Sequence, residues 1–182
     1  MKVIYKIAKS ELSMLFYSPV AWLILVIFTF QTSMAFSGLF SDLVVDQAIG
    51  NRLWDVTERI YTNYRGLLSQ VQQYLYLYIP LLTMGLMSKE RNSGSIKLLF
   101  SSPITNTQII IGKYFAMMIY ALVLIAIILV YIIFGIFTIK DMDIPYTLSG
   151  LLGIYLLTCA YAAIGLFMSS LTSYQVVAAM CT

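Results

Sequence analysis

The sequence predicts an all-α, polytopic membrane protein with four complete transmembrane helices and the start of a fifth. Of its 182 residues, 60% are hydrophobic and 10% are charged, whereas a soluble domain carries roughly 25% charged residues. The charges are also segregated, which leaves long uncharged runs at residues 12–41, 66–88, 114–139 and 144–182. Because about 20 apolar residues cross a bilayer as a helix, the first three runs hold one span each. The fourth run holds one span and begins another.

Residues 1–18 are predicted to form an amphipathic interface helix that precedes a transmembrane domain at 19–182. Lysines share one face of this helix and apolar residues share the opposite face, which suits the inner surface of a membrane. Glu11 breaks the pattern, because it projects near the centre of the apolar face, where a carboxylate needs a partner. A salt bridge to a cytoplasmic cation such as Arg91 would supply that partner, and a snorkelling carboxylate is the alternative. The Ser18-Pro19 pair ends the helix.

The spans follow from the uncharged runs and the residues that interrupt them. They are expected at residues 20–40, 74–88, 109–139 and 147–168, with the start of a fifth at 175–182. Pro80 should kink the second of them, because it removes one backbone donor. After the fourth span only a few apolar residues follow, and seven helical residues rise about 10 Å. We therefore expect the chain to be a fragment of a longer protein.

The outer loop is expected at residues 41–73, between the first and second spans. Apolar residues recur there at spacings of three and four from Ile49 to Val71, which predicts an amphipathic outer helix. Asp55 and Arg59 would pair on its opposite face.

The distribution of charge predicts the orientation. With the N-terminus inside, the inner segments carry seven basic and two acidic residues, and the outer segments carry four basic and six acidic residues. Basic residues gather on the cytoplasmic side of membranes, so this orientation is favoured.

The inner segment at residues 88–105, SKERNSGSIKLLFSSPIT, holds a short predicted helix between two reversals of direction. Gly94 breaks the preceding helix, Ser95 can cap the new one and Pro103 ends it. A T-x-x-Q capping box at 105–108 then marks the start of the third span. The short helix has one apolar side, formed by Ile96, Leu99 and Phe100. A plain solvated loop is the alternative, but such a loop has no need of these caps and stops.

Several function classes lack the residues that they require. Histidine is absent and both cysteines, Cys159 and Cys181, lie in apolar runs, so no metal site or disulfide framework is expected. No nucleophile–base pair and no phosphate-binding glycine loop stands out, so we expect no enzyme. The net charge of +3 is not gathered on a soluble face, which argues against nucleic acid as a partner. We also count no ionisable residue inside the four uncharged runs, which argues against an ion-coupled carrier.

The inner segment resembles the cytoplasmic segment of type-2 ABC exporter permeases. That family typically shows a Glu-Arg pair, a Gly with a small hydroxyl residue, a Leu-Leu pair, a Pro and a Gly-Lys pair. This chain has the corresponding residues at Glu90-Arg91, Gly94-Ser95, Leu98-Leu99, Pro103 and Gly112-Lys113. The N-terminal stretch KSELSMLFYSP is similar to the amphipathic entry helix of the family, with Glu11 at its usual acidic position. Within the family the chain looks most like the permeases associated with bacterial gliding motility.

The resemblance implies a multi-pass permease of the bacterial inner membrane that pairs with a second permease and with two ATPase subunits. It implies that 88–103 is a coupling helix seated in a groove of the ATPase. It also implies that the ATPase subunits bind the ATP and that this chain holds no cofactor. The residues expected to couple to the ATPase are Glu90, Arg91, Gly94, Ser95, Ile96, Leu99, Phe100 and Pro103. Two other classes stay open: a membrane assembly or anchoring factor without transport activity, and an ion-coupled carrier or channel. The sequence does not name the substrate.

Overall fold

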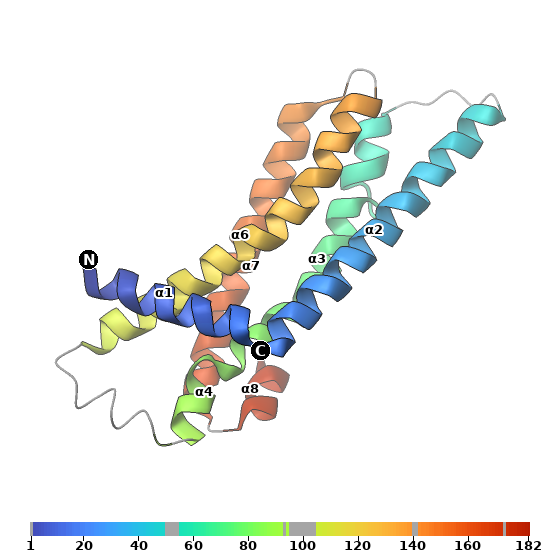
Figure 1. Ribbon diagram of the computed structural model, residues 1–182. Coiled ribbons are helices and arrows are strands. Elements are labelled where there is room, and N and C mark those ends of the chain that lie inside the picture. The colour runs from blue at the N-terminus through green and yellow to red at the C-terminus, as the bar shows by residue number, and fades with distance from the viewer. Residues whose placement is uncertain (1, 50–54, 93, 95–104, 140–141, 173) are drawn as a thin grey trace.

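The computed structural model describes residues 2–49, 55–92, 94, 105–139, 142–172 and 174–182, with the side chains of Lys89 and Arg91 excepted. Every regular element in these ranges is a helix, which confirms the predicted all-α class (Figure 1). In chain order they are α1 (Lys2–Tyr17), α2 (Pro19–Ala48), η1 (Glu58–Thr62), α3 (Leu67–Thr83), α4 (Gly85–Asn92), α6 (Asn106–Thr138), α7 (Ile144–Leu171) and α8 (Gln175–Cys181).

Among the described residues, three helices are long and apolar enough to cross a membrane: α2, α6 and α7. The second predicted span, at 74–88 with a kink at Pro80, is divided into two helices in the structure. α3 has 17 residues and ends at Thr83, and the separate helix α4 begins at Gly85. Pro80, which has no N–H to donate to the helical ladder, lies in the last turn of α3. The proline thus weakens the helix one turn before it is interrupted.

The predicted outer helix is wrong. Asp55 has a positive φ of 50°, and the chain bends again between η1 and α3. At that bend a Cβ on Gly66 would lie 2.7 Å from the backbone carbon of Tyr61, so only glycine fits. At these two points the predicted helix is interrupted, and its recurring apolar residues are divided between the short π-helix η1 and the first turn of α3. Residues 50–54 lie outside the described ranges.

The helices that flank the predicted outer loop also differ from the prediction in their bounds and in their ion pair. α2 continues to Ala48 and α3 already begins at Leu67. Arg59 pairs with Asp46 of α2 at 2.5 Å, where the sequence suggested Asp55. The α2 helix thus extends far enough to supply the carboxylate.

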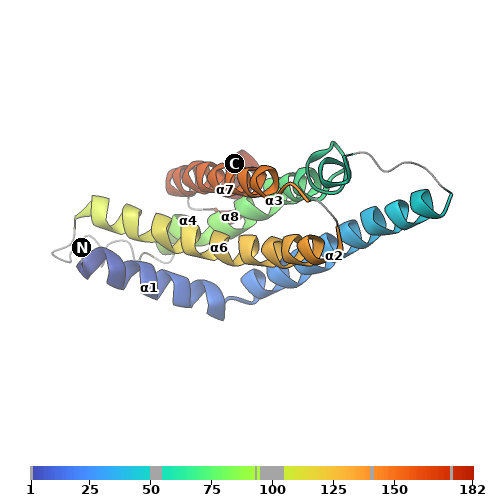
Figure 2. The same cartoon turned by 90° about the horizontal axis from the view of Figure 1, so that it is seen from above.

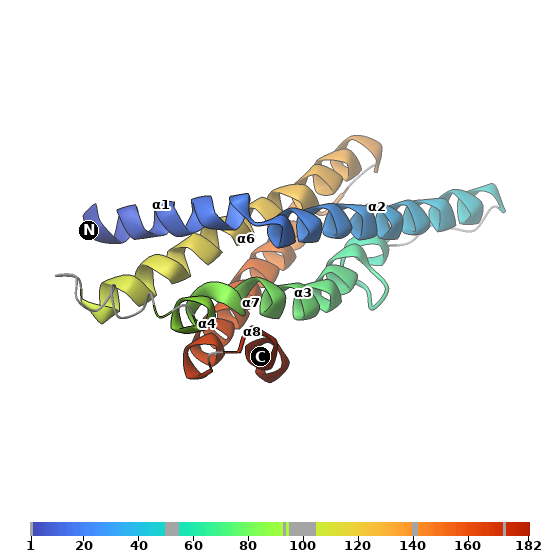
Figure 3. The ribbon, with the colours of Figure 1, turned by 60° about the horizontal axis from the view of Figure 1, so that its bottom comes forward.

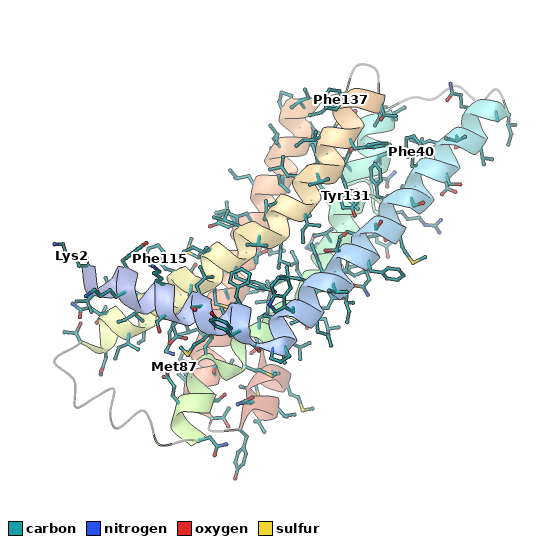
Figure 4. All side chains as sticks on the ribbon, in the orientation of Figure 1. Lys2, Phe40, Met87, Phe115, Tyr131 and Phe137 are labelled. Carbon is teal, nitrogen blue, oxygen red and sulfur yellow. The ribbon has the colours of Figure 1, made fainter. Side chains whose placement is uncertain are left out.

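The core lies between α2, α3, α6 and α7. Figure 2 shows α6 with α1 and α2 on one side and α7 with α3 on the other. Tyrosine hydroxyls join these layers: Tyr120 of α6 donates to the Ala21 carbonyl of α2 at 2.8 Å, and Tyr61 of η1 donates to the Tyr131 carbonyl of α6 at 3.0 Å. Farther along the same layers, aromatic rings of α2 and α6 pack around Phe40 and Tyr131 (Figure 4).

Two local predictions are confirmed at helix ends. α1 ends at Tyr17 and α2 begins at Pro19, as the Ser18-Pro19 pair predicts. The corner is closed by Trp22, whose indole N–H donates to the Phe16 carbonyl at 2.6 Å. At the start of α6 the capping box forms, with the Thr105 backbone N–H donating to Gln108 Oε1 at 3.4 Å.

Candidate functional site

Three helices meet at one buried lysine. Lys113 of α6 is 1% exposed, and its ammonium lies 2.6 Å from Glu11 Oε1 of α1 and 2.7 Å from Glu90 Oε1 of α4. Figure 3 shows α1, α4 and the first turns of α6 at the same end of the molecule. We call Glu11, Glu90 and Lys113 the ion cluster. It joins the N-terminal helix, the helix that contains the first residues of the predicted coupling segment and a membrane-spanning helix.

Close packing between α1 and α6 brings the lysine to Glu11. A Cβ on Gly112 would lie 2.6 Å from Ile7 Cγ2, so glycine is required for this approach. On the α1 side, the buried residues are Ala8 and Glu11, one turn apart. The Gly112-Lys113 pair therefore has two structural roles: the glycine admits α1, and the lysine satisfies the carboxylate that α1 presents.

Burial governs the electrostatics of the ion cluster. It raises the pKa of the Glu11 carboxyl above its ordinary value of 4.5, and the nearby Glu90 carboxylate raises it further. The charge of the Lys113 ammonium and its hydrogen bond lower the pKa of Glu11 but do not outweigh burial. Two carboxylates share one ammonium, so the fully ionised cluster has a net charge of −1.

A cavity of about 400 Å³ adjoins the ion cluster. Its walls are mostly apolar and come from α1, α2, both sides of the α3–α4 break, and α6, with Gln175 of α8 at its edge. Met84 and Gly85, at the break itself, are among the lining residues. The break and the ion cluster thus border the same space.

The structure places some of the predicted site residues. Glu11 is 9% exposed on α1 and, as its position on the apolar face required, has a partner. That partner is Lys113, where the sequence suggested Arg91, whose side chain is not described. Glu90 lies on α4, and the turn residue Gly94 has a positive φ of 73° two residues beyond the end of α4, as expected of a glycine that ends a helix. The remaining predicted coupling residues lie outside the described ranges: Ser95, Ile96, Leu99, Phe100 and Pro103.

One sequence expectation is overturned by the ion cluster. The uncharged runs contain no ionisable residue, but the predicted third span at 109–139 includes Lys113, which lies buried inside α6. It stands in the eighth position of this 33-residue helix, close to its beginning. Its two carboxylate partners come from α1 and α4, which are not among the three candidate spans. The buried charge therefore belongs to the junction at one end of the spans.

Sequence reasoning missed two residues of this region. Lys113 borders the uncharged run at 114–139 and was treated as an inner flanking charge, although its position after Gly112 could have marked it as a packing residue. Ser169, near the end of α7, is fully buried and bonds to the α3–α4 break. Its signal in the sequence is only a hydroxyl directly after the predicted fourth span at 147–168.

Several helices are apolar and long enough to cross a membrane, and ion pairs attach the N-terminal helix at one end of them. These features define a multi-pass helical membrane protein. A family model described as "ABC-2 family transporter protein" matches residues 5–182. The chain therefore belongs to the ABC-2 transporter family and is a permease-type membrane component. Searches of curated proteins and of solved structures found no match to the chain.

Proposed function

We propose that this chain is the transmembrane permease subunit of an ATP-driven exporter, in which a separate ATPase subunit hydrolyses ATP and drives substrate export. The subunit works beside a second permease in a bacterial inner membrane, with its N-terminus in the cytoplasm. Membership of the ABC-2 transporter family supports the permease role. The excess of basic residues in the inner segments supports the orientation.

The ion cluster is the observation that carries the coupling part of this proposal. α4 leads directly into residues 95–104, which hold most of the predicted coupling helix. Glu90 of α4 is tied to Lys113 of α6, and Lys113 is also tied to Glu11 of α1. A displacement of the coupling segment would therefore act on α6 and α1 through short, buried contacts. α6 has 33 residues and, at 1.5 Å per residue, reaches about 50 Å, so it can carry a tilt across the membrane.

The docking surface in this proposal is the apolar side of the coupling helix: Ile96, Leu99 and Phe100. These side chains would fill a groove of the ATPase, and the charges around them, such as Lys97, would steer assembly and set the register. A charge buried in such a groove without a partner costs several kcal/mol.

The test is capture of the cognate ABC ATPase by the purified chain, comparing the wild type with Leu99→Asp. The matched control is Tyr64→Asp, an exposed position near η1, at the other end of the molecule from α4. We expect Leu99→Asp to abolish capture and Tyr64→Asp to leave it intact, with membrane insertion equal in all three proteins. Full capture by Leu99→Asp would show that this stretch is only a loop and would remove the coupling helix from the proposal.

Stimulated ATP hydrolysis separates this proposal from a passive anchor. An anchoring factor binds its ATPase without changing turnover, whereas a permease that couples the two motions changes the hydrolysis rate when substrate is present. We place the chain nearest to the gliding-motility permeases on the residues of its inner segment. The cargo class is not assigned, since lipid-linked, polysaccharide and peptide substrates all suit an apolar span surface.

A further inference from the structure

The hydroxyl of Ser169 sits inside the break between α3 and α4. It accepts hydrogen bonds from the backbone N–H groups of Met87 at 3.1 Å and Ser88 at 3.2 Å, and it donates to the Met84 carbonyl at 2.9 Å. A serine hydroxyl has one donor and two acceptor positions, so this hydroxyl is fully used. Ser169 is also fully buried. One side chain of α7 thus binds both sides of the break.

These contacts replace a bond of the helix itself. In a continuous α-helix the N–H of Met87 would donate to the carbonyl of Thr83, four residues earlier, but α3 ends at Thr83 and α4 begins at Gly85. Here the Met87 N–H donates to Ser169 instead, and the same hydroxyl bonds to the Ser88 N–H and the Met84 carbonyl in the first turn of α4. A side chain inserted into the ladder is a known cause of sharp helix bends. The α3–α4 break is therefore held open by a residue from a third helix.

The neighbouring packing brings α7 close enough for this insertion. Gly165 lies one turn before Ser169 on the same face of α7. A Cβ at Gly165 would lie 2.1 Å from Thr83 Oγ1, so glycine is needed for α7 to approach the last residue of α3. Gly165 and Ser169 act together: the first admits the end of α3, and the second enters the gap that follows.

We propose that Ser169 is a positioning residue that sets the angle between α3 and α4 and so places Glu90 against Lys113. If the hydroxyl is removed, the Met87 N–H can bond the Thr83 carbonyl directly, which straightens the α3–α4 segment. α4 then turns as a body, and Glu90, in its second turn, is drawn away from the ion cluster. The added claim that Ser169 also orients the coupling segment for the ATPase rests on the proposed function.

The first experiment measures the placement of α4 without any ATPase. Nitroxide labels at two exposed positions, Lys6 on α1 and Asn92 on α4, report the separation of these helices by double electron–electron resonance. The native thiols at Cys159 and Cys181 are removed for this purpose. The variant is Ser169→Ala, the rescue is Ser169→Thr, which keeps the hydroxyl, and the control is Ser149→Ala. Ser149 is an exposed serine of α7 whose hydroxyl bonds within its own helix.

We expect Ser169→Ala to shift the distance distribution to longer values, and both Ser169→Thr and Ser149→Ala to give the wild-type distribution. A Ser169→Ala distribution that superimposes on the wild type overturns the proposal. Gly85→Ala provides a second variant, because a Cβ at Gly85 meets no neighbouring atom within 4 Å and alanine favours a continuous helix. It should shift the distance in the same direction even if Ser169→Ala fails to fold, and an unchanged distance in Gly85→Ala also counts against the proposal.

The second experiment is ATPase capture by the same variants. We expect Ser169→Ala to capture less ATPase than the wild type and Ser169→Thr to restore capture. A longer helix distance with unchanged capture would overturn the effect of Ser169 on the coupling segment. Absence of capture by the wild type would contradict the proposed function, while the distance measurement would still decide whether Ser169 positions α4.

Discussion

Replacing Lys113 with methionine should destabilise the protein strongly, because the buried lysine is the shared counter-ion of the buried Glu11 carboxylate and the half-buried Glu90 carboxylate. Methionine keeps a similar length but removes the charge. Each contact, at 2.6 and 2.7 Å, represents a gross attraction of about 6 kcal/mol at an effective dielectric constant near 20. Desolvation offsets much of this, and loss of one partner from a buried ion pair costs about 3–5 kcal/mol. At about 2–4 °C per kcal/mol for a chain of this size, the unfolding temperature should fall by about 6–20 °C.

The assay is thermal unfolding of the detergent-solubilised protein, followed by intrinsic tryptophan fluorescence. Trp22 bonds to Phe16 at the corner between α1 and α2, so its signal responds to detachment of α1. The control is Lys6→Met, which removes an exposed lysine from α1. A combined variant, Lys113→Met with Glu11→Gln and Glu90→Gln, should recover most of the lost stability, because an uncharged buried cluster needs no counter-ion.

The reasoning is refuted if Lys113→Met unfolds within about 2 °C of the Lys6→Met control, which corresponds to less than about 1 kcal/mol. It is also refuted if the combined variant is less stable than Lys113→Met alone. In that case the loss would arise from packing of the lysine side chain and not from its charge.

Two further predictions concern the contact between α1 and α6. Because the folded-state pKa of Glu11 is raised above 4.5, its contribution to stability is fully present below pH 4.5 and is lost as the pH rises through the folded-state pKa. The unfolding temperature of the wild type should therefore rise on acidification from pH 7, and Glu11→Gln should make this rise smaller. An equal dependence on pH in both proteins would contradict the pKa shift. Gly112→Ala should lower the free energy of unfolding by about 1–3 kcal/mol through overpacking against Ile7. Adding Ile7→Ala should recover part of this loss in the same unfolding assay. A Gly112→Ala protein as stable as the wild type would show that α1 can move away freely.

The features that the sequence predicted well are those determined by neighbouring residues. The capping box at 105–108, the corner at Ser18-Pro19 and the turn at Gly94 depend on one or two turns of chain, and all three are present. The face of α1 occupied by Glu11 follows from helical periodicity, which is also local. A carboxylate on that face required a partner, and the structure contains one.

Features that depend on distant residues were not predicted. The partner of Glu11 is 102 residues away, and periodicity within α1 contains no information about it. The break after Thr83 depends on Ser169 of α7 as well as on Pro80, so the sequence predicted only a kink at Pro80. The prediction of the outer helix was wrong for a different reason. The apolar spacing is regular, but the backbone has a positive φ at Asp55 and a close contact at Gly66, and spacing reveals neither of them. The docking role of residues 95–104 stays a prediction.

The separation of Glu11 from Lys113 has a consequence for biosynthesis. A ribosome that adds about 5–20 residues per second makes residue 113 about 5–20 seconds after residue 11. During that interval α1 has left the ribosome but its docking site on α6 does not yet exist. The lysines of α1, Lys2, Lys6 and Lys9, can hold it at an anionic membrane surface meanwhile, where Glu11 is hydrated. Capture of α1 by Lys113 is therefore a late event, and it closes this end of the molecule only after α6 has begun to insert.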